Sequence, residues 1–198
     1  PVAGQITTAF VGDAMNENYT ITRQQNYKDY ERIMFCLKAL GNDSDPAFTH
    51  YLHVENGRSG SRLIATDGKR LHFANLSIKI PAGNYQPVIK DYSISFGTSK
   101  DIAFPAWKNV VPKDADYKGL LQLEGINSGS KVERDERFTN IYCSFLFDTG
   151  FNVNVGYIKD LPTANWKIFT KKGRNNLVLL KNLKDEQNQF AVFVPVSA

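Results

Sequence analysis

The sequence predicts an α+β protein with many antiparallel strands and very few helices. One helix is clear, because apolar residues recur at spacings of three and four from Asn26 to Leu40, the period of a buried helix face. Most of the remaining chain consists of short β-rich segments separated by turn residues. Long helices do not alternate with strands, so a doubly wound α/β fold is disfavoured.

The predicted helix is flanked by recognisable signals. A strand, Tyr19 to Thr22, leads into it, and Gly41-Asn42-Asp43 stops it. Its apolar positions are Tyr27, Tyr30, Ile33, Met34 and Leu37. A second, short helix is expected from Val155 to Leu161, ended by Pro162, whereas residues 127–137 are polar and predict a loop or irregular connection.

The β-rich segments share short length and enrichment in branched and aromatic residues. Asp67-Gly68 between two of them predicts a tight hairpin turn. The predicted strands are residues 51–54, 62–66, 70–76, 77–80, 92–96, 120–123, 144–147, 166–170, 176–180 and 190–196.

Length and composition are those of an ordinary globular protein. The chain has 198 residues, 42% hydrophobic and 22% charged, which suits one large domain or two small ones. No apolar run approaches the roughly 20 residues that span a bilayer, and the N-terminus lacks the features of a signal peptide. Two distant cysteines, Cys36 and Cys143, fit a reducing compartment, so a cytoplasmic location is expected. The net charge of +4 permits a polyanionic partner but does not establish one.

Enzymatic and metal-binding functions find little support. His50 and His53 are three residues apart, and in a strand that spacing directs them to opposite faces. There is no phosphate-binding loop and no nucleophile elbow. Asp67, beside a glycine, is far more typical of a turn than of a catalytic base. We therefore expect no enzyme activity, no metal and no cofactor.

Four short stretches contain motifs that occur together in one family. Residues 63–71 read LIATDGKRL, residues 104–112 FPAWKNVVP, residues 150–153 GFNV, and the C-terminal residues 190–198 FAVFVPVSA. The first resembles the ATDGHRL hairpin in the middle domain of bacterial DNA sliding clamps, and the second resembles their FPDYRRVLP connector between the second and third domains. The third resembles the segment that enters the last domain's second helix. The fourth resembles the C-terminal YVVMPMRL strand, and all four follow the family's order.

This resemblance implies a DNA-clamp-like fold, shortened relative to the family's three domains of two helices each. It divides the chain into an N-terminal extension, 1–18, expected to be of low order, a middle-domain-like unit, 19–104, and a C-terminal-domain-like unit, 105–198. The first unit is expected to lack its second helix and the second unit its first. Either two reduced domains remain, or the halves merge into one compact unit.

In the family, the hairpin, connector and tail line a pocket for short linear peptides of polymerases and other replication proteins. Position by position, the resemblance assigns peptide binding to Thr66, Gly68, Lys69, Arg70, Leu71, Pro105, Asn109, Val110, Val192, Val194, Pro195 and Val196. Apolar residues would anchor the peptide, while Arg70 and backbone groups would orient it. The chain departs from the family at Lys69, where His is usual, and at Asn109, where a basic residue is usual. Valines replace flexible methionines, which predicts a stiffer and smaller pocket.

The family's helices also present basic residues to double-stranded DNA without reading its sequence. The corresponding candidates are Lys28, Arg32, Lys38, Lys171, Lys172 and Arg174. The alternative is that these are ordinary solvated charges, since Asp29 and Glu31 dilute the helix.

Three functions remain open. The first is a homo-oligomeric processivity clamp or docking platform of DNA replication, of a phage or mobile-element type. The second is a clamp-fold adaptor or inhibitor that does not encircle DNA. The third is an unrelated β-rich structural protein with accidental motif matches. A closed ring in solution would favour the first function and a monomer the second.

Overall fold

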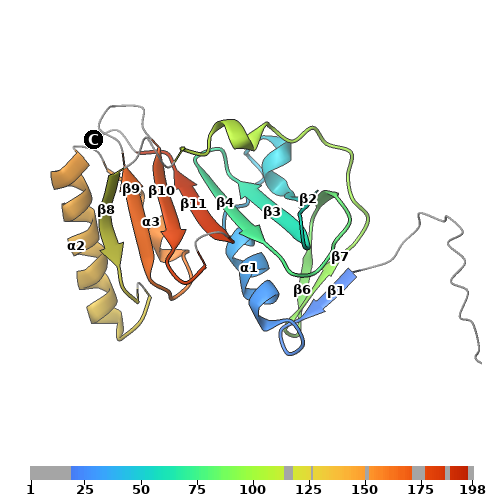
Figure 1. Cartoon of the computed structure of the whole chain (residues 1–198), viewed down its shortest axis with the longest axis horizontal. Coiled ribbons are helices and arrows are strands. Elements are labelled where there is room, and N and C mark those ends of the chain that lie inside the picture. The colour runs from blue at the N-terminus through green and yellow to red at the C-terminus, as the bar shows by residue number, and fades with distance from the viewer. Residues whose placement is uncertain are drawn as a thin grey trace, which may run out of the picture.

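The computed structural model describes residues 19–113, 118–125, 127–149, 152–170, 177–185 and 188–195. In these ranges the strands form two antiparallel sheets (Figure 1). The large sheet has the order β5-β2-β3-β4-β11-β10-β9-β8, and the small sheet the order β1-β7-β6. The predicted class, antiparallel sheets with few helices, is confirmed.

The strands are short, and several lie where the sequence predicts them. Their bounds are β1 Tyr19–Thr22, β2 Leu52–Asn56, β3 Ser61–Thr66, β4 Arg70–Asn75, β5 Gly83–Tyr85, β6 Val88–Lys90, β7 Ser93–Phe96, β8 Lys118–Leu123, β9 Trp166–Thr170, β10 Val178–Asn182 and β11 Gln189–Phe193. The helices are α1 Tyr27–Leu37, α2 Lys131–Thr149 and α3 Val155–Lys159, with 3-10 turns η1 Ala47–His50 and η2 Trp107–Asn109. Within the described ranges, no helix combines the length and the apolar character needed to cross a bilayer.

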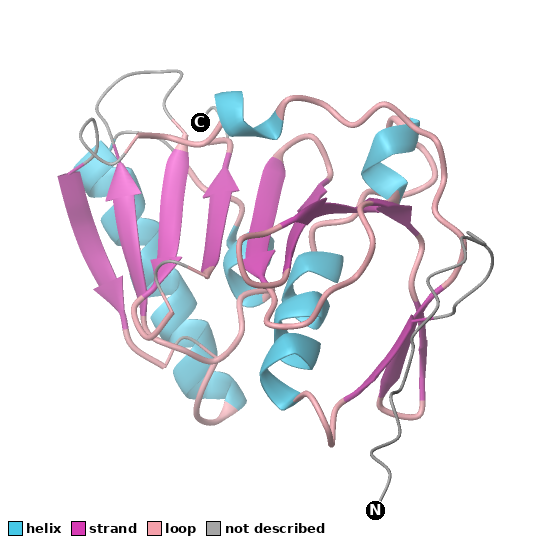
Figure 2. Cartoon of the chain, turned by 45° about the vertical axis from the view of Figure 1, so that its right-hand side comes forward, coloured by secondary structure: helices cyan, strands magenta, loops and turns pink. Residues whose placement is uncertain are grey.

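The large sheet buries apolar side chains on both faces, so its central strands are almost continuously buried. One face carries Leu63, Ala74 and Phe193 into a core shared with α1 and α3. The other face carries Ile64 and Val192 into a smaller cluster closed by the connector after β7. Figure 2 shows α1 and α2 on the same side of this sheet. The opposite side therefore remains for the connector.

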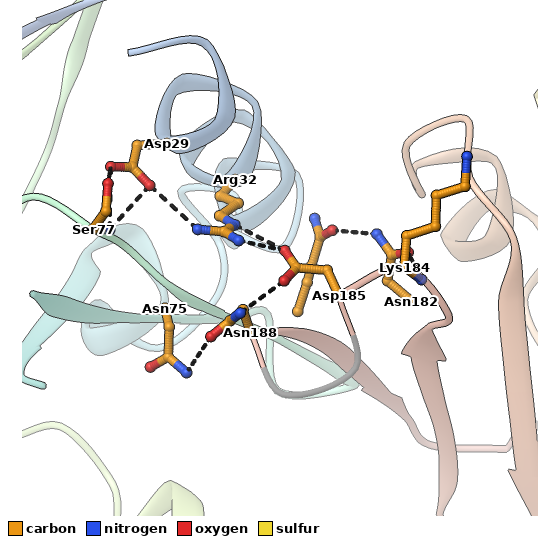
Figure 3. Close-up of polar contacts among 9 residues, drawn as sticks. Asp29, Arg32, Asn75, Ser77, Asn182, Lys184, Asp185 and Asn188 are labelled. Atoms are coloured by element: carbon orange, nitrogen blue, oxygen red, sulfur yellow. Dashed lines mark hydrogen bonds and ion pairs between the residues drawn. The ribbon is translucent and has the colours of Figure 1, made fainter. Parts of the chain in front are cut away.

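The two halves of the chain meet where β4 pairs with β11, with Leu71 opposite Val192. We call this strand pair and its flanking polar contacts the central junction. At one end of it, Arg32 of α1 donates from Nη2 and Nε to Asp185 Oδ2, at 2.5 and 3.0 Å (Figure 3). Asn188 Nδ2 donates to the other oxygen of Asp185 at 2.8 Å, and Asn188 in turn accepts from Asn75. The junction thus ties α1 and β4 to the turn before β11.

Helix α2 is the largest departure from the sequence prediction. The expected loop holds for residues 127–130 but is wrong for 131–137, and the expected strand at 144–147 is wrong, since residues 131–149 form one helix. A reciprocal capping box begins it: the Ser130 amide donates to Glu133 Oε2 at 2.6 Å, and the Glu133 amide donates to Ser130 Oγ at 3.3 Å. The second half therefore contains two α-helices, and the expectation that it had lost its first helix is also wrong.

Smaller departures have local causes. Residues 77–80 are not a strand, because the amides of Ser77 and Ile78 donate to the buried Asp29 carboxylate rather than to a neighbouring strand. Strands β5 and β6 were not predicted, and β10 begins two residues later than expected. On α1, Ile33 is buried as predicted, but Tyr27 is 57% exposed and lies outside the core.

His72 of β4 lies fully buried against α1. Its ring stacks on Phe35, with centroids 4.2 Å apart, and Nδ1 lies 2.7 Å from the Phe35 carbonyl oxygen. A carbonyl only accepts, so Nδ1 carries the proton and the ring is neutral. Among the described residues, Nε2 has no hydrogen-bond partner. The pKa of His72 is lowered to about 3, chiefly by burial and to a smaller extent by the Arg70 charge, against the opposing effect of the Phe35 hydrogen bond.

This buried histidine predicts acid sensitivity. Between the unfolded pKa near 6.5 and the folded value of about 3, the unfolded chain binds one more proton than the folded one, so stability falls as pH falls. From pH 7 to pH 5 the loss is about 2 kcal/mol. Urea unfolding at both pH values measures it. His72→Phe, which keeps the stacking, should show a pH dependence shallower by the same amount; an unchanged pH dependence would contradict the assignment.

Candidate functional site

A pocket of about 210 Å³ lies where the β3–β4 turn, the connector and the end of β11 meet. It is on the face of the large sheet that carries the smaller core cluster. Its lining is mainly apolar: Phe48, Thr66, Gly68, Lys69, Arg70, Leu71, Pro105, Ala106, Trp107, Val110, Leu177, Val192 and Val194. Three segments distant in sequence thus form one concave surface.

Most of the residues nominated from the sequence line this pocket. The exceptions are Asn109 and Pro195, which do not line it, and Val196, which is outside the described residues. Four lining residues were not predicted: Phe48, Ala106, Trp107 and Leu177. Trp107 could have been found, because a tryptophan inside a connector motif is a strong candidate for a contact surface. Phe48 and Leu177 carry no such signal.

The hairpin wall is rigid because its turn is fully hydrogen-bonded. Asp67 Oδ1 accepts from the amides of Lys69 and Arg70 at 2.9 and 2.8 Å, which confirms the predicted turn role of this residue. Thr66 Oγ1 donates to the Arg70 carbonyl at 2.6 Å and accepts from the Gly68 amide at 3.0 Å. Gly68 has φ of 84°, a conformation that favours glycine.

The connector wall is fastened to the sheet through Glu55 of β2. The Trp107 indole Nε1 donates to Glu55 Oε1 at 2.8 Å, and the Lys108 ammonium lies 3.2 Å from Oε2. Burial raises the pKa of Glu55, but these two donors outweigh it and the pKa is lowered overall. Nearby, Phe104 stacks on His53 with centroids 4.4 Å apart. The Trp107 ring is therefore held with 9% of its surface exposed, at the pocket.

The C-terminal strand closes the third side. The Val194 amide donates to the Lys69 carbonyl at 2.8 Å, which continues the β4–β11 pairing into the hairpin turn. Val192 and Leu71, directly opposite each other in this pair, both line the pocket.

Arg70 lines the pocket, but its guanidinium is committed elsewhere. Its Nε donates to Asp67 Oδ2 at 3.0 Å and its Nη1 to Asp160 Oδ2 at 2.5 Å. Nη2 donates to the Lys38 carbonyl after α1, and the group lies 4.5 Å from the Tyr157 ring centroid. Arg70 therefore joins the hairpin to α1 and α3 across the central junction, and the predicted role of orienting a peptide does not fit its guanidinium.

Structural comparison relates this arrangement to known proteins. The chain superposes on DNA polymerase III subunit beta from Pseudomonas aeruginosa with a TM-score of 0.63 and 13% identity, covering 96% of this chain and 69% of that one. The subunit from Borrelia burgdorferi gives a TM-score of 0.62 and 12% identity, covering 96% of this chain and 67% of that one. The sliding clamp from Bacillus subtilis gives a TM-score of 0.59 and 12% identity, covering 100% of this chain and 67% of that one.

The chain has the fold of bacterial sliding clamps. It spans about two thirds of their length. No protein-family model matches the sequence, and no curated protein matches it. The resemblance read from the motifs is thus confirmed at the level of the fold.

The DNA-binding candidates differ in whether their charge is exposed or already paired within the protein. Lys28 on α1 and Lys38 just after it are exposed. Arg32 has a side chain only 15% exposed, and it is paired with Asp185 and, at 3.4 Å, with Asp29 (Figure 3). Its charge is therefore compensated inside the molecule, which argues against phosphate binding. Lys171, Lys172 and Arg174 lie outside the described residues.

The histidines have partners within the protein. His50 ends the 3-10 turn η1 rather than lying in a strand as supposed, and its Nε2 lies 2.7 Å from the Asn42 carbonyl oxygen. His53 Nδ1 lies 2.7 Å from Asn84 Oδ1. In the ranges that the structure describes, no three His, Cys, Asp or Glu side chains cluster as a metal site would require.

The role of Arg70 predicts a large loss of stability on a conservative change. Lysine cannot reproduce the forked contacts to two carboxylates and a carbonyl, so Arg70→Lys should lower the free energy of unfolding by about 2–3 kcal/mol. The shift of the urea midpoint measures this. Arg58→Lys, an exposed change in the β2–β3 turn, should stay within about 0.5 kcal/mol. Equal effects of both changes would refute the junction role.

Proposed function

We propose that this chain is a clamp-like docking platform of DNA replication, acting in the cytoplasm, which captures a short linear peptide of a DNA polymerase or another replication protein. The observation that carries this proposal is the apolar pocket formed jointly by the hairpin, connector and C-terminal strand. These are the segments whose sequences resemble the peptide site of sliding clamps, and the fold is that of a clamp.

The dimensions of the pocket favour a peptide side chain over a small-molecule cofactor. Its 210 Å³ is below the roughly 300–1,000 Å³ typical of small-molecule sites, but it accommodates one or two apolar side chains. Both the hydrogen-bonded turn and the Glu55-fastened connector exist before binding. A preformed pocket saves the entropy of ordering its walls, which supports useful affinity from a small contact.

An interaction with double-stranded DNA is the second part of the proposal. Lys28 and Lys38 are the exposed cations among the described candidates, and two phosphate contacts give weak binding indifferent to sequence. A protein that slides on DNA needs weak contacts of this kind. A ring of six clamp-like units would require three copies of a two-unit chain.

The alternative is an adaptor that binds the peptide but does not encircle DNA. The internal compensation of Arg32 favours this alternative, because it removes one cation from α1. The molar mass in solution, from light scattering, separates the two: a trimer fits a ring and a monomer fits the adaptor. The clamp fold gives less support to the third interpretation, an unrelated structural protein with accidental motifs.

Peptide capture can be followed with the protein's own fluorescence. Of its two tryptophans, Trp166 is fully buried and Trp107 lines the pocket, so a ligand should change the emission of Trp107 alone. We expect a response to hexapeptides with two adjacent large apolar residues, which suit the apolar lining of the pocket. Val110→Arg, at an exposed lining position, should weaken binding at least about tenfold by obstructing the pocket.

The matched control is Val88→Arg, a similarly exposed valine on β6, which should bind like the unchanged protein. No response to any apolar hexapeptide, or equal binding by the Val110→Arg variant, would refute peptide capture at this pocket.

DNA association should be weak and strongly salt-dependent. In fluorescence anisotropy titrations of a 30-base-pair duplex at rising salt, changing Lys28 and Lys38 together to Ala should flatten the slope of log K against log salt by about 2. Lys79→Ala, an exposed lysine after β4, serves as the control and should leave the slope unchanged. No binding at any salt favours the adaptor, and tight binding to one sequence at high salt excludes the clamp.

A further inference from the structure

Among the described residues, two charged side chains line the apolar pocket, those of Lys69 and Arg70. The Arg70 guanidinium is fully engaged by Asp67, Asp160 and the Lys38 carbonyl. Lys69 is exposed, and within the described part of the chain its ammonium forms no ion pair or hydrogen bond. The pocket therefore has one cation available to a ligand.

The backbone of Lys69 is fixed on both sides. Its amide donates to Asp67 Oδ1 at 2.9 Å, and its carbonyl accepts the Val194 amide at 2.8 Å. This places the side chain at the lip of the pocket, where the hairpin turn meets the C-terminal strand. The flexible ammonium can reach a docked ligand, but its point of attachment does not move.

In the described part of the chain, the carboxylates that hold the hairpin and connector walls are already engaged. Asp67 already accepts from two backbone amides and from Arg70 Nε. Glu55, on the connector side, is bound by Trp107 and Lys108. An apolar ligand that covers the pocket would partly desolvate the Lys69 ammonium and provide no partner in return, which costs free energy.

We propose that Lys69 makes this pocket selective for peptides in which a carboxylate adjoins the apolar anchor. This inference rests on the proposed function and specifies the class of its partner. The carboxylate comes either from an Asp or Glu side chain or from the C-terminus of the peptide, because a lysine is a point charge that accepts both.

The experiment compares four forms of one hexapeptide that ends in an apolar anchor. The residue before the anchor is either Asp or Asn, and for each of these the C-terminus is either free or amidated. Binding is followed through Trp107 emission. The preferred carboxylate form should bind roughly three- to fivefold more tightly than its neutral counterpart, the range of a partly exposed ion pair. This preference should shrink as salt increases.

Variants of Lys69 test whether this residue causes the preference for a carboxylate. Lys69→Gln should abolish the difference between charged and neutral peptides, and Lys69→Glu should reverse it in favour of a peptide with Lys beside the anchor. Lys79→Glu makes the same change of charge away from the pocket and should keep the preference for carboxylate.

The outcomes separate this inference from the proposed function. If all four peptides bind equally and Lys69→Gln changes nothing, the pocket still captures peptides but Lys69 does not select among them. If no peptide binds, the proposed function fails together with the inference. A preference that survives Lys69→Gln assigns the recognition of carboxylate to another residue and overturns the inference.

Discussion

The contacts of the Arg70 guanidinium hold this structure together beside the candidate pocket. Its partners come from the hairpin turn, from the carbonyl after α1 and from Asp160 after α3. Arginine does not lose its charge, so these elements must stay assembled around it or leave a poorly solvated cation. The same contacts orient the β3–β4 turn, whose other side is the wall of the pocket. Stability and site geometry are therefore coupled through one side chain.

The two faces of the large sheet differ in how completely they are covered. On one face, α1 and α3 complete a core that takes residues from both halves of the chain. On the other, the short connector covers only part of the apolar surface, and the pocket remains beside Trp107. Because the two faces carry different side chains, a slip by one residue would exchange the members of the two cores and disrupt the packing of both. The strand register therefore also determines where the pocket residues of β4 and β11 lie.

Much of the site was accessible from the sequence, since its turn and its motifs are local. Asp67-Gly68 specifies a hairpin whatever surrounds it, and the connector and tail were identified by their own residues. The same local reasoning missed α2, although Ser130 and Glu133 form a readable capping box, because the apolar residues at 144–147 resembled a strand. Short apolar runs have no clear period, so packing decides between helix and strand.

The sequence alone determined the class of the fold, the hairpin, the helix α1 and the three segments that form most of the candidate pocket, because each depends on neighbouring residues. Only the tertiary structure decided what the charged residues do. Arg32 meets Asp185, 153 residues away, and Arg70 meets Asp160, 90 residues away, so both are compensated within the protein. Lys69, adjacent to Arg70, has no such partner in the described structure. Charge is a property of the residue, but its availability to a ligand depends on which distant residues the fold brings beside it.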